Sequence, residues 1–151
     1  MMEPILDISG LNLSFTTYGK RTQVLHDVSL RVGKGERVAL IGQSGSGKTV
    51  TMRAIIGTLP IPPAKIEGGV IQFEGRDLLQ MAKVERNRLK GTGISIIMQD
   101  PLLSFNPVLT IGRQMDDIVR YADVRLGSKR NSGLRKATIL DTLQKVRLPD
   151  G

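Results

Sequence analysis

The chain has 151 residues and no cysteine, with 40% apolar residues, 24% charged residues and a net charge of +8. This length and composition are typical of one soluble globular domain, and without cysteine these residues cannot form a disulfide framework or a thiolate metal site. The uncharged apolar stretch Ala54 to Ala64 has 11 residues and contains three prolines, so it is too short and too irregular to cross a bilayer.

Two strands are the first elements predicted along the chain, at residues 5–16 and 22–32. Leu11, Leu13 and Phe15 alternate with polar residues, as in a half-buried strand. A polar turn around Tyr18 separates the two segments. They therefore favour an antiparallel pair near the N-terminus.

Residues 37–59 predict a strand, a phosphate-binding loop and a helix. The octet matches the P-loop pattern G-x-x-x-x-G-K-[ST] and reads Gly42, Gln43, Ser44, Gly45, Ser46, Gly47, Lys48, Thr49. Its glycines allow a tight turn whose N–H groups face phosphate oxygens, Lys48 is suited to the β- and γ-phosphates, and the Thr49 hydroxyl is suited to Mg²⁺. The alternative is a Gly/Ser-rich surface turn. An apolar run at 37–41 and a helical pattern through Met52, Ile55, Ile56 and Leu59 favour the P-loop.

Beyond Pro60, which is expected to end this helix, the pattern predicts further elements. They are a short strand at 69–75, a charged surface helix at 77–89 and a buried strand at 94–98. Past Pro107 two apolar stripes at helical spacing predict two helices, separated by a polar loop at 127–133. The stripes consist of Ile111, Met115, Ile118 and Val119, and of Ile139, Leu143 and Val146.

These motifs together resemble the nucleotide-binding subunit of ABC transporters, in the branch that energises dipeptide, oligopeptide and nickel importers. The telling stretch runs from Gln99 to Pro107 and reads Q-D-P-L-L-S-F-N-P, followed by T-I-G at Thr110. It matches the family's Q-loop, with Phe105 where leucine is usual. The resemblance covers Ile5 to Asp150. It implies an incomplete α/β P-loop NTPase fold: residues 1–108 would form an antiparallel β-subdomain with the P-loop and Q-loop, and residues 109–151 the start of a helical subdomain.

The resemblance also implies roles for single residues. ATP and Mg²⁺ are the expected ligands, Lys48 and Gln99 the catalytic groups, and Thr49 and Gln99 the metal ligands. A neutral amide such as Gln99 can ligate a metal and release it without adding charge. Tyr18 lies where the family carries the aromatic residue that stacks on adenine, although it could equally be a surface residue. His26, the sole histidine, lies too early to be the family's switch histidine and is expected on a strand without a catalytic role.

The expected partners are transporter membrane subunits, which dock near the Q-loop, and a second ATP-binding subunit, as a homodimer or a heterodimer. The chain would then be cytoplasmic and peripheral on the inner face of the cell membrane. The family's L-S-G-G-Q signature, its Walker B Asp-Glu and its switch histidine do not occur in these 151 residues. The chain alone is therefore expected to bind nucleotide weakly at most, to hydrolyse it at no useful rate, and to expose apolar strand edges that invite aggregation.

Three alternatives accompany this interpretation. Asp100 follows an apolar run, so it could be a Walker B aspartate of a small-molecule kinase. Eight basic and two acidic residues lie between Arg120 and Arg147, which would suit a soluble ABC-type ATPase in DNA repair or translation. Aromatic residues are only 3% of the chain, which instead favours a solvated basic face and no nucleic-acid partner. The chain could also be a non-catalytic fragment or relic.

Overall fold

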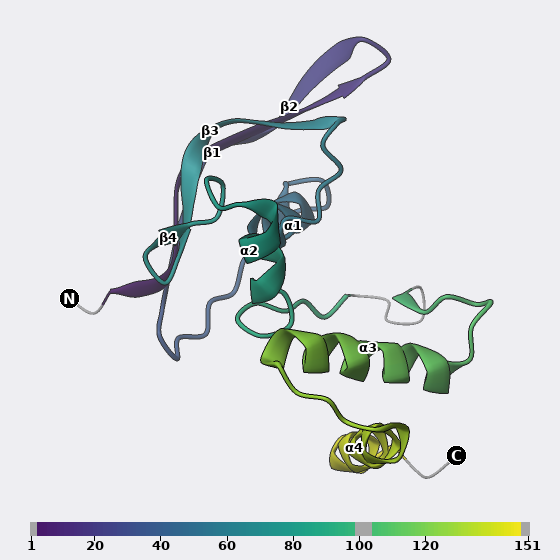
Figure 1. The fold of residues 1–151 in the computed structure, drawn as a ribbon. Helices are drawn as coiled ribbons and strands as arrows, with labels where there is room; N and C mark the ends of the chain where they lie inside the picture. The colour runs from purple at the N-terminus through teal and green to yellow at the C-terminus, as the bar shows by residue number, and fades with distance from the viewer. Residues whose placement is uncertain (1–2, 99–103, 149–151) are drawn as a thin grey trace. The chain divides into compact units, whose positions relative to one another are not determined.

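The structure, a computed structural model, describes residues 3–98 and 104–148. These residues fall into two units that divide between Ser95 and Ile96, and each unit is described by itself. Figure 1 follows the chain from the N-terminal strands to the C-terminal helices.

A four-stranded antiparallel sheet forms the frame of the first unit (Figure 1). The strand order is β2-β1-β3-β4, and the strands are β1 (Pro4–Thr17), β2 (Lys20–Gly33), β3 (Ala64–Phe73) and β4 (Arg76–Asp77). In the register of the central strand, Ile8 lies opposite both Leu30 of β2 and Ile71 of β3. The predicted N-terminal strand pair is therefore confirmed, and the strand predicted at 69–75 begins earlier than its glycines suggested.

The core lies where helix α1 (Lys48–Ile56) packs against the apolar residues of this sheet. Strand β1 buries Ile8, Leu11 and Leu13 almost completely, with an irregularity of the register between Ile8 and Leu11, and the helix contributes Ala54 and Ile55. A buried leucine or isoleucine contributes about 1.5–3 kcal/mol relative to an exposed one. The helix that follows the P-loop is thus held to the sheet by its C-terminal half.

Two expected strands are absent from the described residues. Residues 37–41 and 95–98 adopt no regular secondary structure, and both segments expose large apolar side chains. Ile41 is 91% exposed and Ile97 is 95% exposed. Apolar runs of this length form strands only when neighbouring strands accept their hydrogen bonds, and the four strands of this sheet pair with one another instead. The two strand predictions were therefore wrong for this chain.

Two helix predictions needed new boundaries. Helix α1 ends at Ile56 because Gly57 adopts the left-handed conformation, with φ 71°, before Pro60 is reached. The charged segment predicted as one helix over 77–89 begins with β4 instead. Only its second half forms helix α2 (Lys83–Leu89).

The second unit contains helix α3 (Ile111–Leu126) and helix α4 (Ser132–Lys145), as predicted from the two apolar stripes. Side chains cap the N-terminus of both helices: Arg113 N–H donates to Thr110 Oγ1 at 3.3 Å, and Leu134 N–H donates to Asn131 Oδ1 at 2.9 Å. Within the described residues, no helix combines the length and apolar character that crossing a membrane requires.

Candidate functional site

The P-loop octet lies at the N-terminal end of α1, as the sequence predicted. Gly47 is the N-cap residue of the helix, with φ 89°, and no side chain among the described residues caps this end. The first N–H groups of a helix lack intrahelical acceptors, and the helix dipole places partial positive charge at the same end. An anion is the ligand that suits such a terminus, because it accepts the N–H groups and neutralises the charge.

The glycines of the loop occupy positions that disfavour a side chain, two by close contact and one by its backbone conformation. A Cβ atom on Gly47 would lie 2.6 Å from Leu25 Cδ2 of β2, and a Cβ atom on Gly42 would lie 2.6 Å from Ser46 Oγ. Gly45 has φ +80°, which L-residues rarely adopt. The loop therefore bends tightly and lies close to β2, so its backbone remains accessible to a phosphate group.

Lys48 lies across the loop that precedes it. Its ammonium donates hydrogen bonds to Gly42 O at 2.6 Å, Gln43 O at 2.7 Å and Ser46 Oγ at 3.2 Å. A lysine ammonium has three donors, so these contacts engage all of them. The positive charge is thereby held within the loop, beside the uncapped helix end.

Thr49 lies in the first turn of α1 and is exposed, whereas Thr51, two residues later, is buried and donates to Gly47 O at 3.0 Å. The accessible hydroxyl near the helix N-terminus is therefore that of Thr49. An exposed hydroxyl oxygen is the kind of ligand that Mg²⁺ accepts together with phosphate oxygens. The residues of the loop thus fit a phosphate group accompanied by a hard cation.

The other predicted site residues belong to the β1–β2 hairpin or lie outside the residues that the structure describes. Tyr18 and Gly19 form the two-residue turn of the β1–β2 hairpin, and the Tyr18 side chain is fully exposed. Its stacking role stays a prediction. His26 is exposed on β2, where it was expected. Gln99 and Asp100 lie outside the described residues, so their roles as Q-loop or Walker B residues also stay predictions.

Sequence reasoning missed the contacts at the other end of α1. Arg86 Nη2 donates to Ala54 O at 2.6 Å, and Lys90 Nζ donates to Gly57 O at 3.3 Å. Burial lowers the pKa of the Arg86 guanidinium, and the negative charge of Asp77 opposes this shift. No sequence signal pairs Arg86 with Ala54, since 32 residues separate them and both lie in ordinary helical patterns.

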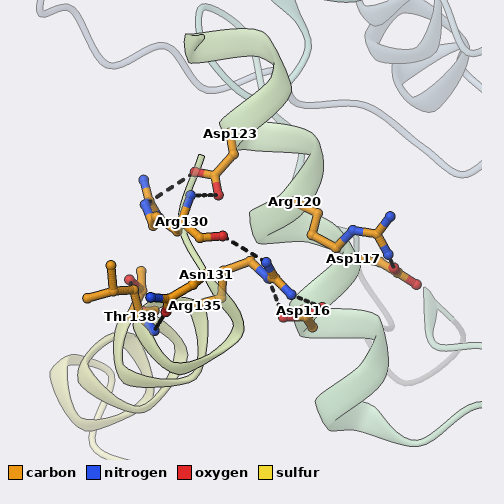
Figure 2. A network of polar contacts seen from close by, with 9 residues as sticks. Asp116, Asp117, Arg120, Asp123, Arg130, Asn131, Arg135 and Thr138 are labelled. Carbon is orange, nitrogen blue, oxygen red and sulfur yellow. Dashed lines mark hydrogen bonds and ion pairs between the residues drawn. The ribbon is translucent and has the colours of Figure 1, made fainter. Parts of the chain in front are cut away.

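Many basic side chains between Arg120 and Arg147 form ion pairs with carboxylates (Figure 2). Arg135 donates to both carboxylate oxygens of Asp116, at 2.6 and 3.2 Å, and so joins α4 to α3. Arg130 pairs with the buried Asp123, and Arg120 pairs with Asp117. Lys145 pairs with Asp141 on α4. At least half of the eight basic residues from Arg120 to Arg147 are thus matched to carboxylates, which weakens the case for a nucleic-acid surface.

Comparison with known proteins gives consistent results. A family model described as "ABC transporter" matches residues 25–150. The chain is 37% identical over 150 residues to the dipeptide transport ATP-binding protein DppD of Bacillus subtilis (strain 168), which covers 99% of this chain and 43% of that protein. It is 39% identical over 115 residues to the oligopeptide transport ATP-binding protein OppD of the same organism, over 76% of this chain and 32% of that protein. The chain thus spans less than half the length of these relatives.

A solved structure described as a dimeric, post-hydrolysis state of the ATP-binding cassette MJ0796 bound to ADP and Pi is similar in fold, with a TM-score of 0.76 at 17% identity. The match covers 96% of this chain and 58% of that one. A second structure, described as a dimer of the same cassette, gives a TM-score of 0.74 at 16% identity, with the same coverage. At this identity the likeness concerns the fold, which agrees with the predicted incomplete ABC-type α/β architecture.

Proposed function

The chain belongs to the ABC transporter family, and from this premise we propose that it is the ATP-binding part of an importer subunit that couples ATP binding and hydrolysis to the uptake of peptides or a related small solute. One observation carries the proposal: the uncapped N-terminus of α1 lies beside the Lys48 ammonium, in a tight loop that has no room for a Cβ atom at Gly42 or Gly47. The names of the peptide-transport relatives support the choice of importer.

In this proposal the loop residues hold the triphosphate. The N–H groups at the start of α1 and the Lys48 ammonium bind the β- and γ-phosphates, and the Thr49 hydroxyl holds Mg²⁺. The metal, when bound, neutralises the charge of the phosphate oxygens. Gln99 would sense the metal and the γ-phosphate, and Tyr18 would stack on adenine.

The proposed partners are a second ATP-binding subunit and the membrane subunits of the importer. Both follow from the family, whose cassettes dimerise and work with membrane permease subunits. Through the membrane subunits the chain would lie on the cytoplasmic face of the cell membrane. A soluble ABC-type ATPase that acts on nucleic acid is the second candidate, and the excess of basic residues between Arg120 and Arg147 would be its support.

Binding of ATP with Mg²⁺, measured by calorimetry, tests the role of the loop. Lys48→Ala should weaken binding by about tenfold or more, since a hydrogen bond to a charged group is worth about 1.5–3 kcal/mol. Lys34→Ala is the matched control, because it removes an exposed lysine from the turn before the loop. Equal affinity of the two variants would contradict the proposal.

Copurification tests the choice of partner. The tagged chain should bring down integral membrane subunits encoded beside it, and nuclease treatment should not change the set of bound proteins. Recovery of nucleic acid in place of membrane subunits would favour the soluble ATPase instead.

A further inference from the structure

We propose that Arg86 is a positioning residue for the nucleotide-binding loop. From α2 it holds the C-terminal end of α1, the helix whose other end carries Gly47, Lys48 and Thr49. The proposal rests on the proposed function of the loop and deepens it, because it makes the placement of the loop depend on a residue that lies outside it, on α2.

Arg86 acts as a C-cap of helix α1, although it is 32 positions away from Ala54 in the sequence. Its Nη2 atom lies 2.6 Å from Ala54 O and 3.5 Å from Ile55 O, so the first contact is the strong one. The last carbonyls of a helix have no intrahelical donors and carry partial negative charge. Lys90, which follows α2, adds a second cation through its contact with Gly57 O.

Gly57 makes room for this arrangement. Its N–H donates to Arg53 O at 2.9 Å, Thr58 N–H donates to the same oxygen at 3.0 Å, and together these bonds close the helix. A Cβ atom on Gly57 would lie 2.6 Å from Arg86 Nε and 2.7 Å from Arg86 Cζ. The guanidinium therefore lies directly against the backbone where the helix ends.

The chemistry of the site favours a role beyond filling space. The surroundings of Arg86 are largely apolar, with Ile55, Leu78 and Ile94 beside it, and its Nε has no hydrogen-bond partner among the described residues. Taking a cation out of water is costly, whereas an apolar side chain of similar length would fill the same volume without that cost. Compared with such an apolar side chain, the guanidinium adds a short side-chain hydrogen bond to Ala54 O, which also accepts one from Gly57 N–H at 3.3 Å.

The helix is short enough to transmit a displacement from one end to the other. Its nine residues span about 13 Å at 1.5 Å per residue. Gly47 packs against Leu25 at one end, and Arg86 holds Ala54 at the other. If the hold at the C-terminal end is lost, the helix can shift along its axis, and the N–H groups that face the phosphates shift with it.

The test compares Arg86→Met with a control of matched stability in the complete 151-residue chain. Methionine keeps the length of the side chain and removes its donors. Ile71→Val shortens a buried side chain of the same core without removing a hydrogen-bond donor, and a further truncation to Ala is available if the melting temperatures need matching. The readouts are the affinity for ATP with Mg²⁺ and, without nucleotide, the amide hydrogen exchange of residues 47–51.

Arg86→Met is expected to bind ATP roughly tenfold more weakly, the change that corresponds to loss of one charge-assisted hydrogen bond. Exchange at residues 47–51 should accelerate, and Arg86→Lys should restore part of both properties because it keeps one donor and the charge. If Arg86→Met cannot be purified folded, Arg86→Lys against Ile71→Val decides by the same readouts.

Two outcomes separate this proposal from the proposed function. If the unsubstituted chain does not bind ATP, the proposed function fails, and the exchange measurement alone still decides the positioning role. If the exchange of residues 47–51 and the ATP affinity of Arg86→Met equal those of the stability-matched control, the positioning role is overturned.

Discussion

Single residues determine the shape of the P-loop, and its glycines do so for different reasons. Gly45 is required for its φ of +80°, and a Cβ atom there would meet nothing within 4 Å. Gly42 excludes a Cβ atom because Ser46 Oγ is too near. Gly47 combines a φ of +89° with a close approach to Leu25, so two independent costs meet at one position.

Among the glycine-to-alanine substitutions of the loop, Gly47→Ala is therefore expected to destabilise the protein most. It should lower the free energy of unfolding by about 1–3 kcal/mol, because overpacking and backbone strain add. Gly68→Ala is the control, since a Cβ atom there has nothing within 4 Å and no positive φ is involved. Urea denaturation of both variants measures the difference. A Gly47→Ala midpoint equal to that of Gly68→Ala would argue against the packing described here.

At the residue scale, the part of the site that is contiguous in sequence could be predicted, and the rest could not. The residue pattern from Gly42 to Thr49 predicted both the tight turn and the start of α1. Arg86 could not be foreseen, because its partner Ala54 lies 32 residues earlier and only the folded chain brings them together. The motif predicts phosphate as the partner of Lys48, whereas its contacts with the carbonyls of its own loop depend on backbone geometry that no residue pattern encodes.

At the scale of elements, helices α3 and α4 are joined by a bidentate ion pair. The hydrogen bond from Arg135 lowers the pKa of the Asp116 carboxyl group, and the charges of Arg135 and Arg120 act in the same direction. Arg135 also donates to Arg130 O at 2.8 Å in the loop between the helices. One guanidinium thus ties together both helices and their connection (Figure 2).

This pair predicts an acid-dependent loss of the α3–α4 contact. Because the pKa of Asp116 is lower in the folded state, its contribution is fully present above the ordinary aspartate value of about 3.9 and is lost as the pH falls through the lowered folded value. The helical circular dichroism of the chain, recorded during acid titration, checks this. In Asp116→Asn the corresponding step should vanish.

The control for this titration is Asp117→Asn, which removes an exposed pair with Arg120 within α3. The pKa of Glu67 is also lowered, first by its hydrogen bond from Ser14, so the sheet titrates in the same direction. Only the difference between the unsubstituted chain and Asp116→Asn therefore reports on the helical pair. An unchanged titration in Asp116→Asn would show that the pair contributes nothing measurable.

Elements with a local sequence pattern were predicted correctly, whereas two strand predictions that depend on a distant partner strand were wrong. The β1–β2 hairpin follows from alternation and a two-residue turn, and α3 and α4 follow from their apolar stripes. The segments at 37–41 and 94–98 have equally strong apolar patterns but no partner strand among the described residues. A strand, unlike a helix, requires hydrogen bonds from another part of the chain.

At the scale of the whole molecule, exposed apolar residues outside regular structure predict self-association. Ile41 and Ile97 are more than 90% exposed in segments whose backbone forms no sheet. Light scattering behind size-exclusion chromatography should show mass rising with concentration. Ile41→Lys combined with Ile97→Lys should reduce this rise, whereas Val84→Lys, an exposed position on α2, should not. A constant monomer mass would refute the prediction.

Hydrolysis is the second property of the whole chain. We propose that the isolated 151-residue polypeptide binds ATP without sustained turnover, since the resemblance to the family implies a signature motif and a Walker B glutamate that these residues do not contain. Phosphate release under saturating ATP and Mg²⁺ measures this, with Lys48→Ala as the blank for contaminating activity. Turnover above that blank, at the rate of an intact transporter, would contradict the expectation.

The hydrogen bonds of Lys48 to its own loop change what a measured affinity means. Its ammonium already has acceptors in Gly42 O, Gln43 O and Ser46 Oγ, so a phosphate must take the place of oxygens that are present beforehand. Binding is then an exchange between internal and external acceptors, and its free energy is the difference between two sets of strong contacts. A substitution that weakens the internal set without removing the ammonium would shift this balance toward the nucleotide, and affinity would rise although no contact to ATP had been added.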